Sequence, residues 1–462
     1  MEFIALGETD DVAASCHFLN IDGTGLVLDA GVDPRTDGKE SLPRFDLVHS
    51  HKDRYVDHAI ITHAHHDHIG SLPVLIREFP HLLAHMTDAT KRLLEFLLPA
   101  SARLQERKLY SGETEHEPLF SEDELSFQSH IYMTHELGNE FDVTGTLGNT
   151  KIKARFYTAG HILGSVGVEL RFEEDGEERR VFYTSDTSMR PQSIIPGAEY
   201  PDTTDILILE STLANDEEAE KTNREKETDR FRKTVEEVME RGGTALVPVF
   251  VMGRAQETLA LIDDMKEDGV IDADIPVYTA GSMRAIADLY DKTRRTTPRV
   301  NREFKVFGVD QRRMPRSEEA KDEALDGPCI VVASSGMMFE PTLSNRIGRL
   351  VVENENDAIL LVGYSKEDTA AARLKEAALN GKQVTLHPAT GPQDVRCTVD
   401  RFRFSGHSNR RDLLRVVDAM GPEHVVLVHG EPDAREWMRD QIRESHPEIT
   451  VHVPAGGEVV DL

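Results

Sequence analysis

The sequence has few cysteines, few aromatic residues and no long apolar run. Its three cysteines, Cys16, Cys329 and Cys397, lie too far apart for a disulfide framework or a CxxC pair, which indicates a reducing compartment. No apolar stretch approaches the length of a membrane span, and the first residues show no basic and then apolar leader. We therefore expect a cytoplasmic protein with no membrane partner.

Positive charge is also scarce. The chain has 53 Lys and Arg residues against 83 Asp and Glu residues, which gives a formal net charge of −30. Because phosphate binding usually requires a basic surface, this charge by itself argues against a nucleic-acid partner. Two interpretations stay open. The acidic residues can form a solvated shell suited to a salty cytoplasm, or positive charge can be concentrated at bound metals and a few arginines in a cleft.

The length and the element pattern predict two domains, one inserted in the other. A chain of 462 residues exceeds the size at which one hydrophobic core keeps growing. Short strands with a hairpin turn at Asp175-Gly176 fill the first half, apart from a helix over 88–105. From residue 206 buried strands alternate with helices, and the early pattern returns after a strand at 399–404. We expect residues 216–229 to be a charged, solvated stretch before a helix over 231–241.

The strongest chemical signal is the run His63-Ala64-His65-His66-Asp67-His68, directly after an apolar stretch at 59–61. Imidazole and carboxylate are ligands of a borderline ion such as zinc. A strand that ends in a loop can direct alternate side chains at two adjacent ions, with His63 and His65 on one, and Asp67 and His68 on the other. The run therefore predicts a metal centre rather than a solvated histidine cluster.

Four further polar residues stand where a strand gives way to a loop: Asp29, His161, Asp186 and His429. Taken singly, each is as well explained by capping of a turn. Taken together and in this order, they indicate a site on the rim of a β sandwich, where strands hold the ligands and loops admit a substrate.

This order of motifs resembles that of the metallo-β-lactamase fold, and the later motifs resemble its β-CASP nuclease branch. Similarity is greatest to RNA-cleaving members related to the nuclease subunit of the cleavage and polyadenylation specificity factor. The resemblance implies an α/β protein: a metallo-β-lactamase αββα sandwich over 1–208 and 396–462, with an α/β β-CASP domain inserted over 209–395. The later motifs are Glu210-Ser211-Thr212, Pro248 to Glu257, Ser335-Gly336-Met337, Gly363-Tyr364, Ser405-Gly406-His407 and Leu427 to Glu431.

The same resemblance implies two zinc ions, with manganese chemically acceptable at one of them. It assigns the first ion to His63, His65 and His161, the second to Asp67, His68 and His429, and a bridging position to Asp186.

The resemblance also implies catalytic roles. His407 would donate a proton to the departing 3′ oxygen, and Glu210 would hold its ring in one tautomer. Asp29 would accept a hydrogen bond from a ligand imidazole, and Asp67 would act as both ligand and catalytic group. A structural ion pair at the domain junction stays open as the alternative for Glu210 and His407.

Contacts with substrate are predicted for Arg254 and for the backbone at Ser335 and Gly336, although such loops are as often simple turns. The remaining histidines of this region are expected on the surface or beside the ligands: His49, His51, His58 and His66.

The resemblance thus implies a two-zinc ribonuclease that cleaves single-stranded RNA endonucleolytically in RNA processing or decay, leaving 5′-phosphate and 3′-hydroxyl ends. Action as a 5′-exonuclease and assembly as a homodimer stay open. Two other functions remain as alternatives: a catalytically silent RNA-binding scaffold, which would usually lack ligands, and a small-molecule hydrolase such as a lactonase or thioesterase, which needs neither an inserted domain nor His407.

Overall fold

The computed structural model describes residues 1–7, 14–52, 54–363 and 369–462, which form two compact units. The first unit comprises 1–191, 197–220 and 407–462, and the second comprises 192–196 and 221–406. The chain therefore leaves the first unit twice, briefly at 192–196 and then for residues 221–406, and returns each time. The units divide at 220/221 and 406/407, whereas the predicted domain boundaries were 208/209 and 395/396.

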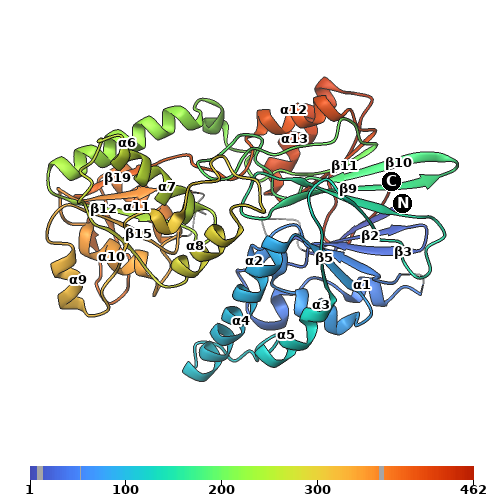
Figure 1. The fold of residues 1–462 in the computed structure, drawn as a ribbon, viewed down its shortest axis with the longest axis horizontal. Coiled ribbons are helices and arrows are strands. Elements are labelled where there is room, and N and C mark those ends of the chain that lie inside the picture. The colour runs from blue at the N-terminus through green and yellow to red at the C-terminus, as the bar shows by residue number, and fades with distance from the viewer. Residues whose placement is uncertain (8–13, 53, 364–368) are drawn as a thin grey trace. The chain divides into compact units, whose positions relative to one another are not determined.

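The first unit contains two seven-stranded sheets (Figure 1). One sheet has the order β22-β1-β2-β3-β4-β5-β6 and contains β1 (Glu2–Ala5), β2 (His17–Ile21), β3 (Thr24–Leu28), β4 (His58–Ile60), β5 (Leu83–Met86), β6 (Tyr132–Thr134) and β22 (Val459–Asp461). The other has the order β21-β20-β11-β10-β9-β8-β7 and contains β7 (Glu140–Asp142), β8 (Lys153–Thr158), β9 (Val166–Glu174), β10 (Glu177–Tyr183), β11 (Ile206–Glu210), β20 (His424–Val428) and β21 (Thr450–His452).

Both sheets contribute to one buried apolar cluster, in which Leu28 of β3 packs with Phe156 of β8 and Ile208 of β11. The outer face of the second sheet is covered by α12 (Arg410–Met420) and α13 (Pro432–Ser445), whose apolar sides pack on β11 and β20. Beside the first sheet lie α1 (Asp46–His49), α2 (His66–Ile69), α3 (Leu72–Glu78), α4 (Asp88–Ser111) and α5 (Glu122–Gln128). The expected αββα sandwich is therefore present.

Local sequence explains the helix ends. The side chain of Thr87 caps the N-terminus of α4, and Gly112 ends the helix in a left-handed conformation, so the predicted helix at 88–105 extends further than expected. The expectation that 216–229 is a solvated stretch was wrong in part, because α6 (Arg224–Glu240) begins within it. Asn223 accepts a hydrogen bond from the amide of Lys226 and so starts α6 early.

The second unit is built on a six-stranded parallel sheet with the order β14-β13-β15-β12-β16-β19. Its strands are β12 (Thr244–Pro248), β13 (Val277–Thr279), β14 (Arg312–Arg313), β15 (Cys329–Ala333), β16 (Ala358–Leu361) and β19 (Thr398–Arg401), beside the pair β17 (Gln383–Val384) and β18 (Gln393–Asp394). Besides α6, its helices are α7 (Arg254–Glu267), α8 (Ser282–Thr293), α9 (Glu318–Ala324), α10 (Leu343–Val351) and α11 (Ala370–Asn380).

In the described part of the chain, no helix combines the length and apolar character needed to cross a membrane.

Candidate metal centre

Strand ends of the first unit deliver the candidate ligands to one place. β3 runs into Asp29, β4 leads to His63, β10 is followed by Asp186, and β20 by His429. The backbone is left-handed at Asp29, with φ 60°, and at His429, with φ 48°. Such a conformation costs roughly 1–3 kcal/mol for a residue other than glycine and is retained mainly at functional sites.

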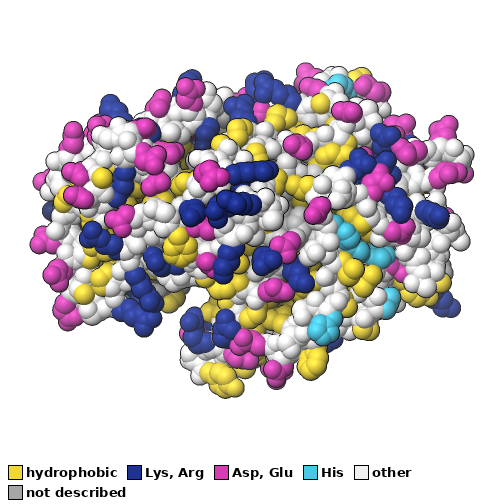
Figure 2. All heavy atoms as spheres, in the orientation of Figure 1, with side chains coloured by type: hydrophobic (Ala, Val, Ile, Leu, Met, Phe, Trp, Pro, Cys, Tyr) yellow, Lys and Arg dark blue, Asp and Glu magenta, His cyan; other side chains and the backbone are white. Residues whose placement is uncertain are grey.

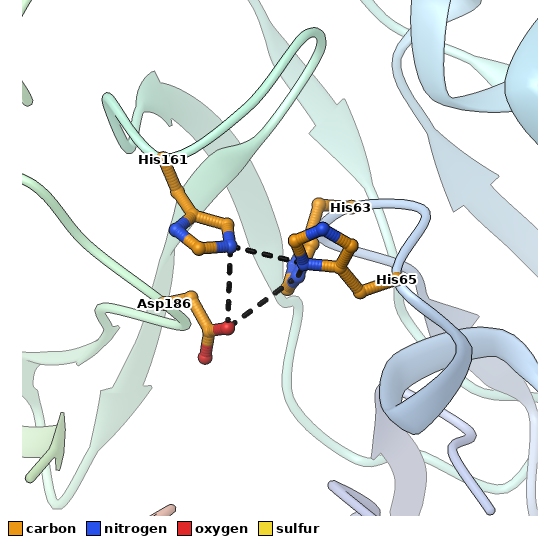
Figure 3. Close-up of side chains that lie close together, drawn as sticks. All are labelled: His63, His65, His161 and Asp186. Atoms are coloured by element: carbon orange, nitrogen blue, oxygen red, sulfur yellow. Dashed lines mark hydrogen bonds and ion pairs between the residues drawn. The ribbon is translucent and has the colours of Figure 1, made fainter. Parts of the chain in front are cut away.

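The first group of donors is formed by His63, His65, His161 and Asp186 (Figure 3). His65 Nδ1 lies 3.2 Å from His63 Nε2 and 3.0 Å from His161 Nε2. Asp186 Oδ2 lies 3.5 Å from both Nε2 atoms. Three imidazole nitrogens and one carboxylate oxygen therefore surround a single point, and residues from three separate segments supply them.

The second group is formed by Asp67, His68 and His429. His429 Nε2 lies 3.5 Å from Asp67 Oδ2, and His68 Nε2 lies 3.4 Å from Asp186 Oδ1. The two carboxylate oxygens of Asp186 thus face different groups, Oδ2 the first and Oδ1 the second. All seven residues predicted as metal ligands are brought together in these two groups.

The donor atoms fit metal ions, because several of them have no hydrogen-bond partner. Among the described residues, His68 Nε2, His429 Nε2 and Asp186 Oδ1 are buried and accept or donate no hydrogen bond. An unsatisfied buried polar atom costs roughly 1–3 kcal/mol, so three at one site call for an explanation. Ions held by imidazole and carboxylate would satisfy all three.

The protonation states of two donors suit this interpretation, whereas Asp186 and the other nearby carboxylates outweigh burial and raise the pKa of His68 and of His429. Burial lowers the pKa of His63 well below its usual value and so favours the neutral imidazole that binds metal. Burial alone would raise the pKa of Asp186, but the nearby imidazoles of His429 and His68 outweigh it and hold the pKa well below its usual value. Asp186 is therefore a carboxylate, able to offer both oxygens.

A buried carboxylate orients one of the imidazoles. Asp29 Oδ2 accepts hydrogen bonds from His68 Nδ1 at 2.9 Å and from the Tyr183 hydroxyl at 3.0 Å. Thr62 donates to the same side chain through its amide and its hydroxyl, at 2.8 Å each. With Nδ1 occupied, His68 directs Nε2 into the donor group. This role was predicted for Asp29 from the sequence. The roles of Thr62 and Tyr183 were not predicted, because the only signal for them is that they lie next to the ligand motifs in the sequence.

His407 and Glu210 form an ion pair beside the first group. His407 Nδ1 lies 3.0 Å from Glu210 Oε2, and its Nε2 lies 4.0 Å from Asp186 Oδ2. Burial lowers the pKa of His407, but Glu210 and then Asp186 outweigh this effect and raise it to about 9. Glu210 is fully buried and also accepts the amide of Thr187 at 2.8 Å, so it fixes the loop that carries Asp186.

Two of the histidines expected on the surface or beside the ligands, His66 and His58, have different environments. His66 is exposed, as expected. His58 was expected on the surface or beside the ligands, and this was wrong. It is buried in β4, where its Nδ1 lies 2.9 Å from His85 Nε2, and His85 Nδ1 lies 2.8 Å from His135 Nε2. Strand pairing of β4 with β5 brings these imidazoles into a chain that the spacing of the sequence does not reveal.

The predicted substrate contacts all belong to the second unit. Arg254 is buried and donates to the carbonyl of Phe404 and to the side chain of Gln192, so its guanidinium already has partners within that unit. Glu257, in the same motif, accepts the amides of residues 193–195. The motif thus anchors the segments that enter and leave the second unit. Ser335 and Gly336 are partly exposed, whereas Tyr364 lies outside the described residues.

Three family models match the chain. They are described as the metallo-beta-lactamase superfamily over 9–188, the Beta-Casp domain over 255–374, and the Zn-dependent metallo-hydrolase RNA specificity domain over 392–454. The chain belongs to the β-CASP branch of the metallo-β-lactamase superfamily. The predicted family and fold are therefore confirmed.

Curated relatives match this β-CASP chain along almost its whole length. Cleavage and polyadenylation specificity factor 73 of Drosophila melanogaster is 28% identical over 99% of the chain and 64% of that protein. Endoribonuclease YSH1 of Candida glabrata is 27% identical over 100% of the chain and 59% of that protein. Integrator complex subunit 11 of Danio rerio is 28% identical over 99% and 73%. The chain thus spans less than two thirds of the length of the first two relatives.

A solved structure shares the fold of the β-CASP chain. The crystal structure of a protein of unknown function from Enterococcus faecalis V583 has a TM-score of 0.55 with 14% identity, and the match covers 100% of this chain and 99% of that one.

Proposed function

We propose that the protein is a two-zinc ribonuclease that hydrolyses phosphodiester bonds of single-stranded RNA endonucleolytically, in RNA processing or decay. The observation that carries the proposal is Asp186, whose two oxygens face two complete donor groups beside the His407–Glu210 pair. The names of the relatives, which include an endoribonuclease and a cleavage factor, support the same activity. The complete donor set disfavours a catalytically silent scaffold.

The first ion would be held by His63, His65 and His161, and the second by Asp67, His68 and His429, with Asp186 shared. When bound, two such ions supply a water of lowered pKa and offset the negative charge that develops on the phosphate. Manganese in place of one zinc would meet the same oxygen and nitrogen donors.

The side chains of the protein supply orientation and a proton. Asp29 fixes the ring of His68, so that its Nε2 faces the second group before substrate arrives. Glu210 holds His407 Nδ1, which leaves Nε2 to give a proton to the departing 3′ oxygen. A leaving 3′ hydroxyl requires that the opposite product carry a 5′ phosphate.

The proposal is tested with a circular single-stranded RNA, which has no end for an exonuclease, and with analysis of the product ends and of bound metal. Expected are linear products with 5′-phosphate and 3′-hydroxyl ends, loss of cleavage in chelator, and recovery with zinc.

Two variants in one motif sharpen the test. His65→Ala removes a donor of the first group and should abolish cleavage, whereas His66→Ala removes an exposed neighbour and should leave cleavage unchanged. Cleavage that survives metal removal, or a zinc-loaded protein that leaves RNA intact, would overturn the proposal. Cleavage of linear but not circular RNA would overturn its endonucleolytic part.

The proposal places the enzyme in the cytoplasm, which agrees with its three free, buried cysteines, and is compatible with a homodimer.

A further inference from the structure

One segment of this acidic protein is strongly basic. Residues 282–316 contain ten Lys and Arg side chains and four Asp and Glu side chains, within a chain that has 53 and 83. The segment comprises α8, the short helix η4 (Val306–Gly308) and the edge strand β14. Dark blue side chains gather over this part of the second unit in Figure 2. Positive charge therefore exceeds negative charge over this segment, in contrast to the chain as a whole.

The segment folds back on itself, so its charges share one region of the second unit. The carboxylate of Asp291 on α8 accepts the amides of Val306 and Phe307 at 2.8 and 3.1 Å, which fixes η4 against α8. Gln311 donates to the carbonyl of Val306 at 2.8 Å and thereby connects η4 to β14. Loop, helix and edge strand are thus held together by hydrogen bonds.

Most of these charges are not neutralised by the protein. Asp291 is occupied by backbone amides, and Asp288 pairs with Lys292 at 2.6 Å. Within the described ranges, six exposed basic side chains of the segment have no carboxylate partner, and we call them the basic strip: Arg295, Arg302, Lys305, Arg312, Arg313 and Arg316. An alternative explanation is that Lys and Arg on an edge strand prevent its pairing with another sheet. That explanation applies to Arg312 and Arg313 but not to the other four residues.

An aromatic ring lies within the same segment. The side chain of Phe307 is 40% exposed, and the guanidinium of Arg284 lies 5.2 Å from its ring centroid. Val300 is exposed as well. Unpaired basic groups together with an exposed aromatic ring are the features by which proteins hold single-stranded nucleic acid, through phosphate contacts and base stacking.

We propose that the basic strip and Phe307 form an RNA-binding surface of the second unit, which holds the phosphate backbone of the single-stranded substrate outside the metal centre. This inference rests on the proposed ribonuclease function for its choice of ligand, since a basic surface alone does not distinguish RNA from an acidic protein. It also resolves the conflict between the net charge of the chain and a nucleic-acid partner.

The test measures binding of a fluorescent single-stranded RNA to the full chain across a salt series, in chelator so that no cleavage occurs. Two variants each remove two charges, R302Q/K305Q in the loop and R312Q/R313Q on the edge strand. The control K382Q/R396Q removes two exposed charges from the same unit outside the segment. Thermal unfolding midpoints close to that of the parent protein show that each variant is folded.

Each strip variant should bind RNA roughly tenfold more weakly at physiological salt, and its plot of log K against log salt should be shallower by about 1.4, or about 0.7 for each lost contact. F307A should weaken binding without changing the slope, because stacking releases no counterions. The control should match the parent protein.

Equal affinities and slopes for the strip variants and the control would overturn the inference. A changed oligomeric state with unchanged RNA binding would overturn it too, and would identify a protein partner instead. A parent protein that binds RNA through the strip but never cleaves it would refute the proposed function and leave the inference standing.

Discussion

Replacing Asp29 by Asn tests whether a buried carboxylate controls the affinity of the second metal group. Asp29 is fully buried and accepts hydrogen bonds from His68, Tyr183 and Thr62. Asn has the same shape and tolerates the left-handed backbone found there, with φ 60°, so the substitution adds little backbone strain. What changes is the number of acceptors, because an amide has one oxygen and one NH₂ group.

The expected magnitude follows from the tautomer of one ring. If the amide oxygen stays with Thr62, the NH₂ group faces His68 Nδ1, which must then accept and lose its proton. The proton moves to Nε2, the atom that must be bare to bind a metal. Loss of such a supporting hydrogen bond typically costs 10–100-fold in metal affinity, or roughly 1.4–2.7 kcal/mol.

Competition with a chromophoric zinc chelator would resolve the two zinc affinities that the proposed centre requires. We expect Asp29→Asn to weaken one of them 10–100-fold and to leave the other unchanged. The matched variant Tyr183→Phe removes a donor from the same carboxylate without touching His68. It should lower the free energy of unfolding by roughly 1.5–3 kcal/mol and affect zinc binding less. Two parent-like zinc affinities in a folded Asp29→Asn protein would refute the reasoning.

Three further predictions follow from single contacts. His407→Ala should lower kcat by roughly 10²–10⁴-fold while zinc content stays at the parent level, and a parent-like kcat would exclude a proton-donor role. Burial, with the neighbouring imidazoles, lowers the pKa of His85 in the folded protein to about 3. In the unfolded chain the same imidazole keeps a pKa of about 6.5, so below pH 6.5 the unfolded chain binds a proton that the folded protein does not. Stability is therefore lost as pH falls through 6.5. At pH 5 the loss through this group is roughly 2 kcal/mol, so urea unfolding should show a smaller loss of stability between pH 7 and pH 5 for His85→Gln than for the parent. Glu257→Gln should cost roughly 1–3 kcal/mol and speed hydrogen exchange at residues 193–195, whereas exposed Glu267→Gln should do neither.

The ligand motifs could be predicted because their geometry is local. A strand followed by His63, His65, Asp67 and His68 presents donors at a spacing that β structure and one short helix fix by themselves. Assignment of His161, Asp186 and His429 needed the resemblance to a family, since their convergence depends on the pairing of distant strands. The alternation of buried strands and helices after residue 206 similarly predicted the α/β character of the second unit.

Other features could not be predicted, because they depend on which strands become neighbours. The chain of His58, His85 and His135 exists only when β4 pairs with β5 and β5 with β6. Arg254 donates hydrogen bonds to Gln192 and to Phe404, which are distant in sequence from Arg254 and from each other. The early start of α6 was not predicted, because the charged residues around Asn223 indicated a solvated loop and its role as the N-cap was not recognised.

The interleaving of the chain has a consequence for biosynthesis. β20, β21 and β22 join the two sheets of the first unit from beyond residue 423, and His407 and His429 also come after residue 400. A nascent polypeptide that has reached residue 400 therefore lacks strands from both sheets and one donor of the second group. Closure of both sheets and completion of the second donor group therefore have to wait until the residues from 424 onward have been synthesised.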